Sequence, residues 1–136
     1  MPATLENAMA LAKDNGINII DFRLPYIKSA AHSETKTLIL DGKRMRGNRE
    51  ATELIYHELG HFATGSFYTI AAPLQTWGRC EARADAWSIQ HMCPADRIRK
   101  ALKDGNRTYW ELAEALDVSE SFVIKAIDFY TRKRQL

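Results

Sequence analysis

Residues 49–64 read REATELIYHELGHFAT, and this stretch decides how the whole sequence is interpreted. Apolar side chains recur in it three and four residues apart, the spacing that places them along common faces of a helix. The residues that can pack this helix against a core are Leu54, Ile55, Leu59 and Phe62. Gly65 follows directly, and glycine is a frequent helix stop. The stretch therefore predicts one long helix that is anchored by apolar residues and carries polar groups between them.

Those polar groups form the pattern His57-Glu58-Leu59-Gly60-His61. Four residues make about one helical turn, so His57 and His61 lie on one face, close enough for both imidazoles to bind one zinc ion. Glu58 is rotated away from the metal, yet it can take a proton from the attacking water as a general base must. A five-letter pattern also arises by chance, so this one needs support from elsewhere in the chain.

Support comes from Glu81, which follows His61 by 20 residues and lies near the start of another predicted helix. A catalytic zinc takes three protein ligands, and two histidines with one glutamate are a known set in peptidases. Asp85 shares a helix face with Glu81 and can accept the free N–H of a ligating histidine. The alternative is that Glu81, Arg83 and Asp85 form a solvated face with local ion pairs. Beside the histidine pair, we favour the metal site.

The rest of the chain predicts an α+β fold. A helix over 4–15 precedes extended segments in 17–22 and 26–40, with a turn at 32–35, which predicts a small, mostly antiparallel sheet near the N-terminus. Further helices are expected over 78–92, 94–103, 109–116 and 119–130. We expect 1–136 to form a single domain. Its parts are a helix and sheet at 1–48, metal-binding helices at 49–93 and a helical segment at 94–136.

Composition limits the classes of protein to which the chain can belong. The 136 residues include 19 Lys and Arg against 17 Asp and Glu, a net charge of +2, and 46% are hydrophobic, which excludes a disordered chain or a uniformly charged surface. Two cysteines, Cys80 and Cys93, are too few for a disulfide framework. No signal peptide is expected, and the longest stretch without charged side chains, 61–78, is too interrupted to span a membrane. These features predict a cytoplasmic protein.

The segments 109–116 and 119–130 predict a helix-turn-helix-like pair. Between Glu111 and Tyr130 the charged residues are Glu111, Glu114, Asp117, Glu120, Lys125 and Asp128. A DNA-reading helix needs positive charge to meet phosphates. The acidic balance therefore favours packing or protein docking, and we expect no direct nucleic-acid binding. The basic residues at 132–134 are interpreted as a solvated tail.

Several of these motifs carry a family resemblance. His57-Glu58-Leu59-Gly60-His61 followed by Glu81-x-x-x-Asp85 resembles the zinc peptidases called gluzincins. The run from Glu81 through Trp87 to Met92-Cys93-Pro94, and the segment 111–119, resemble the ImmA/IrrE metallopeptidase family. Trp87 replaces a usual phenylalanine, and 89–92 is more polar than usual. The resemblance implies zincin-type helices packed on the sheet. It also implies site-specific cleavage of a helix-turn-helix repressor in phages, mobile elements or a DNA-damage response.

Two hypotheses follow from the sequence. In the first, the chain is an endopeptidase in which His57, His61 and Glu81 bind one zinc ion, Glu58 is the catalytic base and Asp85 supports a ligand. In the second, the chain is a non-catalytic regulator that binds a repressor or another protein. Two further points stay open. The residue that stabilises the oxyanion is unassigned, with Tyr56, Tyr68 and His91 as candidates, and the strand at 36–40 is either structural or an edge for an extended substrate.

Overall fold

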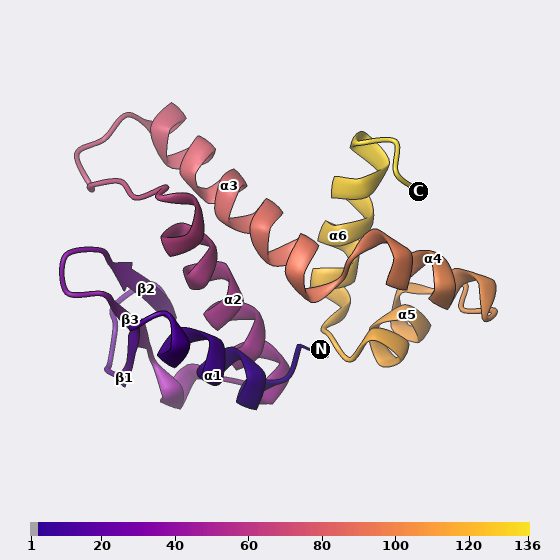
Figure 1. The fold of residues 1–136 in the computed structure, drawn as a ribbon, viewed down its shortest axis with the longest axis horizontal. Helices are drawn as coiled ribbons and strands as arrows, with labels where there is room; N and C mark the ends of the chain where they lie inside the picture. The colour runs from indigo at the N-terminus through magenta and orange to yellow at the C-terminus, as the bar shows by residue number, and fades with distance from the viewer. Residues whose placement is uncertain (1–2) are drawn as a thin grey trace. The chain divides into compact units, whose positions relative to one another are not determined.

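The computed structural model of the protein describes residues 3–136. Its helices and strands are α1 (Leu5–Asp14), β1 (Asn18–Asp21), β2 (Ser29–His32), β3 (Thr37–Leu40), α2 (Asn48–Thr64), α3 (Leu74–Met92), α4 (Ala95–Lys103), α5 (Tyr109–Leu116) and α6 (Glu120–Arg132), with a short 3-10 turn at Gly42–Arg44 (Figure 1). The chain divides into two compact units, one ending at Ser88 and the other Ile89–Leu136. The α+β class predicted from the sequence is confirmed.

The sheet of the first unit has the strand order β1-β3-β2. β2 and β3 form an antiparallel hairpin, in which Ala31 lies opposite Leu38. β1 instead runs parallel to β3, and the chain that leaves β1 crosses over to β2 on the opposite side of β3. β3 is therefore paired on both sides, and this corrects the suggestion that 36–40 could offer a free edge. The edge of β2 that faces away from β3 pairs with no other described strand.

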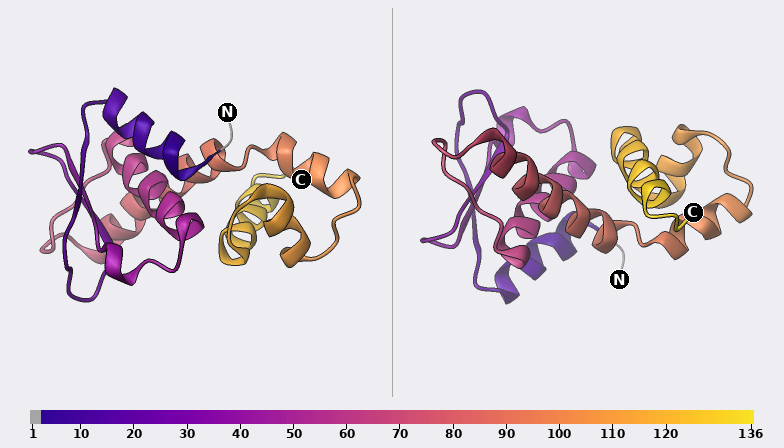
Figure 2. Two further views of the ribbon diagram at one scale, coloured as in Figure 1. Left: turned by 90° about the horizontal axis from the view of Figure 1, so that it is seen from below. Right: turned by 90° about the horizontal axis from the view of Figure 1, so that it is seen from above.

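One face of the sheet is covered by helices. Side chains alternate across a strand, so Ile19, Leu38 and Ala31, which lie in register, point to the same face. α1 and α2 lie on one side of the sheet (Figure 2), and the Leu38 side chain is fully buried. Burying a leucine side chain stabilises a fold by about 1.5–3 kcal/mol. This core fixes α2 against the sheet, and α2 carries the histidine pair.

The backbones of α2 and α3 come very close to each other at Gly60 of α2 and Ala84 of α3. A Cβ built on Gly60 would lie 2.6 Å from the carbonyl oxygen of Ala84 and 2.9 Å from its Cα. Glycine at this position therefore lets the two helices meet backbone to backbone. α2 ends as predicted at Gly65, whose φ of 62° is left-handed.

α3 begins four residues before the predicted start at Gly78. Pro73 precedes the helix, and its carbonyl accepts hydrogen bonds from the amides of Thr76 and Trp77. A glycine inside a helix costs about 0.5–1 kcal/mol, which is tolerated when neighbouring residues favour the helix. Nothing lies within 4 Å of a Cβ built on Gly78, so the glycine reflects no close contact here.

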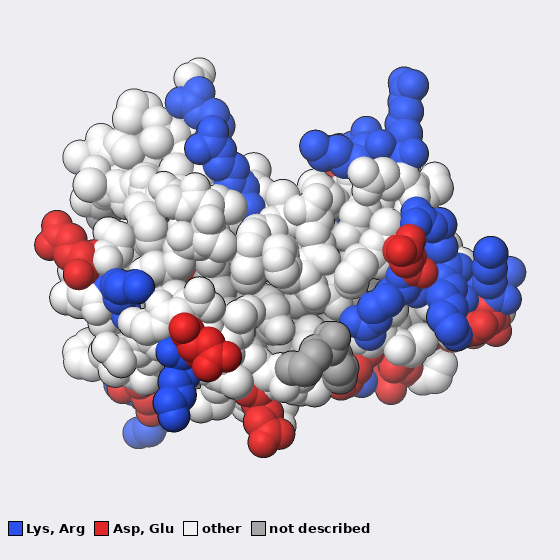
Figure 3. Space-filling view, in the orientation of Figure 1, with Lys and Arg blue, Asp and Glu red and all other residues white. Residues whose placement is uncertain are grey.

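The second unit packs the helices α4, α5 and α6 around a small apolar core. Its buried residues include Ile98, Leu112, Val118, Phe122, Val123 and Ala126. α5 is followed by Asp117 in a left-handed conformation, and the Ser119 hydroxyl caps α6 by accepting from the Phe122 amide at 3.2 Å. Lys and Arg side chains gather over α4 (Figure 3). α5 and α6 are the helix pair that the sequence predicts over 109–116 and 119–130.

Two negative findings concern the described residues. No helix within 3–136 combines the length and the apolar composition that a membrane span requires. Cys80 and Cys93 are both buried, and neither forms a disulfide.

Candidate metal centre

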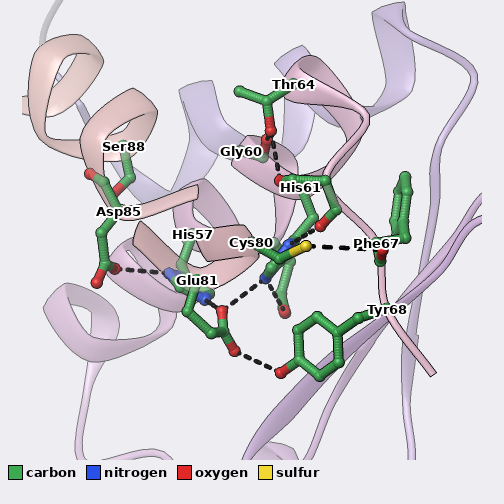
Figure 4. A network of polar contacts seen from close by, with 12 residues as sticks. His57, Gly60, His61, Thr64, Phe67, Tyr68, Cys80, Glu81, Asp85 and Ser88 are labelled. Atoms are coloured by element: carbon green, nitrogen blue, oxygen red, sulfur yellow. Dashed lines mark hydrogen bonds and ion pairs between the residues drawn. The ribbon is translucent and has the colours of Figure 1, made fainter. Parts of the chain in front are cut away.

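α2 brings His57 and His61 to one face, one turn apart. Their ring centroids lie 5.0 Å from each other, with the rings almost perpendicular. His61 is 5% exposed, because it points from the helix into the interior of the first unit. The Nε2 atoms of both rings point toward α3 (Figure 4). The geometry is that of two imidazoles that can share a ligand.

Glu81 of α3 is the group they share. Its Oε2 atom lies 2.9 Å from Nε2 of His57 and 2.9 Å from Nε2 of His61 (Figure 4). The three ligand atoms all lie within 4.8 Å of one another. Two imidazole nitrogens and one carboxylate oxygen form a donor set that suits a divalent metal such as zinc. His57, His61 and Glu81, chosen from the sequence, are thus brought together where they could hold one metal ion.

The other ring nitrogens of the two histidines are also engaged. Nδ1 of His57 lies 2.9 Å from Oδ1 of Asp85, and Nδ1 of His61 lies 2.7 Å from the carbonyl oxygen of Ser66. A carbonyl oxygen only accepts, so His61 carries its proton on Nδ1 and offers Nε2 as a lone pair once a metal takes the place of the hydrogen bonds. Asp85 likewise engages Nδ1 of His57, which leaves Nε2 of that ring for a metal.

Electrostatics within the cluster follow from these contacts. Burial disfavours the protonated form of His57, but its hydrogen bonds to Asp85 and Glu81 outweigh burial and raise its pKa to about 10. Hydrogen bonds from His57 and His61 hold the pKa of Glu81 well below its usual value. Protonated imidazoles of His57 and His61 therefore stabilise the negative charge of the carboxylates that they contact. A metal cation would satisfy the same field.

Glu58 lies beside this cluster and is 5% exposed. Its Oε1 atom is 4.0 Å from Nε2 of His61, and its Oε2 atom has no hydrogen-bond partner among the described residues. Burial raises the pKa of Glu58. A buried carboxylate oxygen without a partner costs free energy, and such groups in folded proteins call for a chemical reason. Here the unpaired oxygen fits a site that is completed by another molecule.

A pocket of about 240 Å³ opens next to Glu58 and His61. Strand β2 lines it with Ala30 and Ala31, and the segment after α2 lines it with Tyr68. Glu81 also borders the pocket. Two of the three candidate metal ligands, His61 and Glu81, thus border a cavity that strand β2 also lines.

The three candidates for stabilising an oxyanion lie in different places. Tyr68 borders the pocket and its hydroxyl donates to Oε1 of Glu81 at 2.8 Å. Burial and the hydrogen bond to Glu81 raise the Tyr68 pKa to about 12, so the hydroxyl keeps its proton at neutral pH. Tyr56 instead packs its ring against Trp87, 6.2 Å away between centroids. His91 belongs to the second unit, Ile89–Leu136.

Sequence reasoning missed three contributors to the site. The Ser66 carbonyl left no signal, because any residue supplies a backbone oxygen. Strand β2 is too short and too rich in small residues to reveal its place at the edge. Gly60 did leave a signal, since a glycine in the middle of a strong helix costs stability and indicates a close approach of another backbone.

Comparison with known proteins bears on this geometry. The model of peptidase family M78, described as the IrrE N-terminal-like domain, matches residues 12–128. The chain belongs to the ImmA/IrrE peptidase family. The matched range contains the whole of α2 and α3, so the ImmA/IrrE domain includes every residue of the candidate metal centre. A search of curated proteins found no match to the chain.

Proposed function

We propose that this ImmA/IrrE family member is a zinc-dependent endopeptidase. The observation that carries the proposal is the buried Glu58 carboxylate, which has an oxygen without a partner among the described residues and belongs to a residue that lines the pocket together with His61 and Glu81. Two histidines and a glutamate leave a further coordination position open on zinc, as catalytic sites do. A proton acceptor placed beside an open metal position is the arrangement that metal-assisted hydrolysis requires.

Each residue has a separate task in this proposal. Zinc bound to His57, His61 and Glu81 supplies Lewis acidity, which lowers the pKa of water and polarises a carbonyl group. Glu58 accepts the proton of the attacking water and returns it to the leaving amine. Because burial raises the pKa of Glu58, its proton affinity moves toward the working range of a base at neutral pH. Asp85 holds the His57 ring in its binding orientation.

Strand β2 supplies a place for the substrate backbone. The Asp41 amide donates to the Lys28 carbonyl at 2.8 Å, and hydrogen-bonded pairs alternate along an antiparallel ladder. The backbone groups of Ser29 and Ala31 therefore point away from β3, and no described strand pairs with them. An extended peptide can add to this edge and pass beside the metal ligands, as peptides do when they extend sheets.

The substrate that we propose is a helix-turn-helix transcriptional repressor of phage or mobile-element type, which would make the protein an anti-repressor in the cytoplasm. Support comes from the family membership and from a pocket that suits an extended protein segment. Direct nucleic-acid binding is not part of the proposal. Cations on α4 are partly neutralised, since Arg99 pairs with Asp96 and Lys100 pairs with Asp104.

The competing hypothesis is a regulator that keeps the fold and the metal but cleaves nothing. It assigns no chemistry to Glu58, so a binding protein should tolerate Glu58→Gln. The unpaired Glu58 oxygen favours the peptidase, because a protein that only binds has no reason to keep a buried carboxylate without a partner.

Glu58→Gln separates the two hypotheses. We expect purified protein to hold about one zinc ion per chain and to cleave members of a mixed peptide library, with products identified by mass spectrometry. Glu58→Gln should keep the zinc and the circular dichroism spectrum and lose cleavage by at least about 100-fold, the typical contribution of a general base. The matched control is Glu53→Gln, on the same helix but outside the pocket lining. Full activity of Glu58→Gln would overturn the peptidase mechanism.

A further inference from the structure

The two carboxylate oxygens of Glu81 have different partners. Oε2 lies 2.9 Å from Nε2 of His57 and of His61, where a metal would bind. Oε1 accepts a hydrogen bond from the Tyr68 hydroxyl at 2.8 Å (Figure 4). One oxygen thus faces the histidines, and the other is occupied by the phenol.

Tyr68 is itself held in place by α3. Its ring stacks on the indole of Trp77, with 5.1 Å between centroids and 30° between planes. The Trp77 indole N–H donates to the Thr69 carbonyl at 3.1 Å, which ties the segment carrying Tyr68 to the helix. Trp77 and Glu81 are four residues apart on α3 and so lie on the same face. One helix therefore supplies both the carboxylate and the ring that places the hydroxyl against it.

Glu81 needs such a restraint more than the two histidines do. Its side chain is 43% exposed, against 22% for His57 and 7% for His61. An exposed glutamate has several rotatable bonds and loses conformational freedom when it is fixed. Both histidines are oriented through Nδ1 by other groups, whereas among the described residues Glu81 is hydrogen-bonded outside the histidine pair by the Tyr68 hydroxyl alone.

We infer that Tyr68 is a positioning residue that fixes Glu81 as a single-oxygen ligand of the metal. By occupying Oε1, the hydroxyl keeps that oxygen away from the metal and aims Oε2 at the place between the imidazoles. The coordination position that Oε1 would otherwise fill stays available to water and substrate. This inference rests on the proposed metal site, and it does not depend on peptidase activity.

Tyr68→Phe tests the inference, because it removes the hydroxyl and keeps the ring that stacks on Trp77. We expect zinc affinity, measured by competition with a chromophoric chelator, to fall by about 10-fold, the lower end for lost support of a metal ligand. In cobalt-substituted protein the visible absorption spectrum should change, because Glu81 can then bind through both oxygens. Tyr109→Phe, on α5 of the second unit, is the matched control and should change neither quantity.

A double-mutant cycle separates failure of this inference from failure of the metal site. Glu81→Ala should lower zinc affinity strongly, and Tyr68→Phe should cause no further loss in the Glu81→Ala protein, because Tyr68 acts only through Glu81. Unchanged zinc affinity in Glu81→Ala would overturn the metal site itself. The positioning role alone would be overturned by an unchanged cobalt spectrum in Tyr68→Phe, or by an equal loss of affinity with and without Glu81.

Discussion

At the scale of single residues, the buried Glu58 carboxylate is a group that lowers the stability of the fold. Glu58 is buried, its pKa is raised by burial, and one of its oxygens has no partner among the described residues. Each of these features disfavours folding with an ionised Glu58, since removing a carboxylate from water costs free energy that hydrogen bonds must offset. His57 and His61 differ, because both ring nitrogens of each have partners.

Glu58→Met should therefore make the metal-free protein more stable. Methionine fills a similar volume without a buried charge, so at pH 7 we expect the free energy of unfolding to rise by about 1–2 kcal/mol. The sign follows from the pKa. A carboxyl group whose pKa is raised on folding destabilises the fold progressively as the pH rises above its usual value, and fully once the pH exceeds the raised pKa. The gain should therefore shrink as the pH falls through the raised pKa and be lost below the usual value of 4.5.

Urea unfolding of chelator-treated protein at pH 7 and pH 4 measures this difference. Glu53→Met on the same helix serves as the comparison, because Glu53 does not line the pocket. A Glu58→Met protein that is less stable than the parent at neutral pH would show that Glu58 supports the fold.

At the scale of elements, the site depends on how α2 and α3 meet. The ligands are divided between the two helices, so the position of Glu81 relative to the histidines is set by the distance between the helix backbones. Gly60 permits that distance, since any Cβ there would overlap the Ala84 backbone. A helix backbone cannot move aside as a flexible side chain can, so a small change at Gly60 is transmitted to the ligands.

Gly60→Ala should consequently destabilise the protein and weaken zinc binding together. We expect a loss of about 1–3 kcal/mol of unfolding free energy, the typical cost of overpacking a core, with zinc affinity reduced in whatever fraction folds. Gly78→Ala on α3 is the control. Its Cβ meets nothing within 4 Å, so alanine should stabilise the protein by about 0.5–1 kcal/mol through helix propensity. Thermal unfolding with and without zinc measures both effects, and a Gly60→Ala protein as stable as Gly78→Ala would contradict the close approach.

At the scale of the whole molecule, the chain contains two compact units joined through α3, which runs across the boundary at Ser88. All the candidate ligands lie in the first unit. The second unit has its own apolar core and a buried tyrosine, Tyr130, whose hydroxyl donates to the Cys93 carbonyl at 2.8 Å. We propose that 1–136 still unfolds as the single domain expected from its length.

Zinc provides the test of that proposal. A metal that binds only the folded protein raises its stability by about 2.7 kcal/mol when free metal is 100 times the dissociation constant. If the chain is one cooperative domain, calorimetry should show one transition that zinc moves as a whole, and chelation should move it back. Two transitions, of which zinc moves only that of the first unit, would show that the units unfold independently. His57→Ala should abolish the shift caused by zinc.

The amino-acid sequence alone is enough to predict the parts of the candidate site that depend on local geometry. The spacing of His57 and His61 places both on one face of a helix whatever surrounds it, because the helical repeat is fixed by the backbone. Glu81 and Asp85 could be chosen for the same reason, once a second helix was expected. The α+β class follows from alternating and helical apolar patterns, although α3 begins four residues before the predicted range of 78–92.

Which groups far apart in the sequence come into contact depends on the three-dimensional fold. The Ser66 carbonyl, the Tyr68 hydroxyl and the edge of β2 reach the site through loop paths and strand order. β3 is the central strand because β1 pairs with it in parallel on the side opposite β2. β2 is therefore the edge strand beside the pocket. Such contacts depend on packing between residues far apart in sequence, and no local periodicity records them. The sequence therefore predicts the candidate metal ligands, and the fold determines which other groups contact them and which strand edge lies beside the pocket.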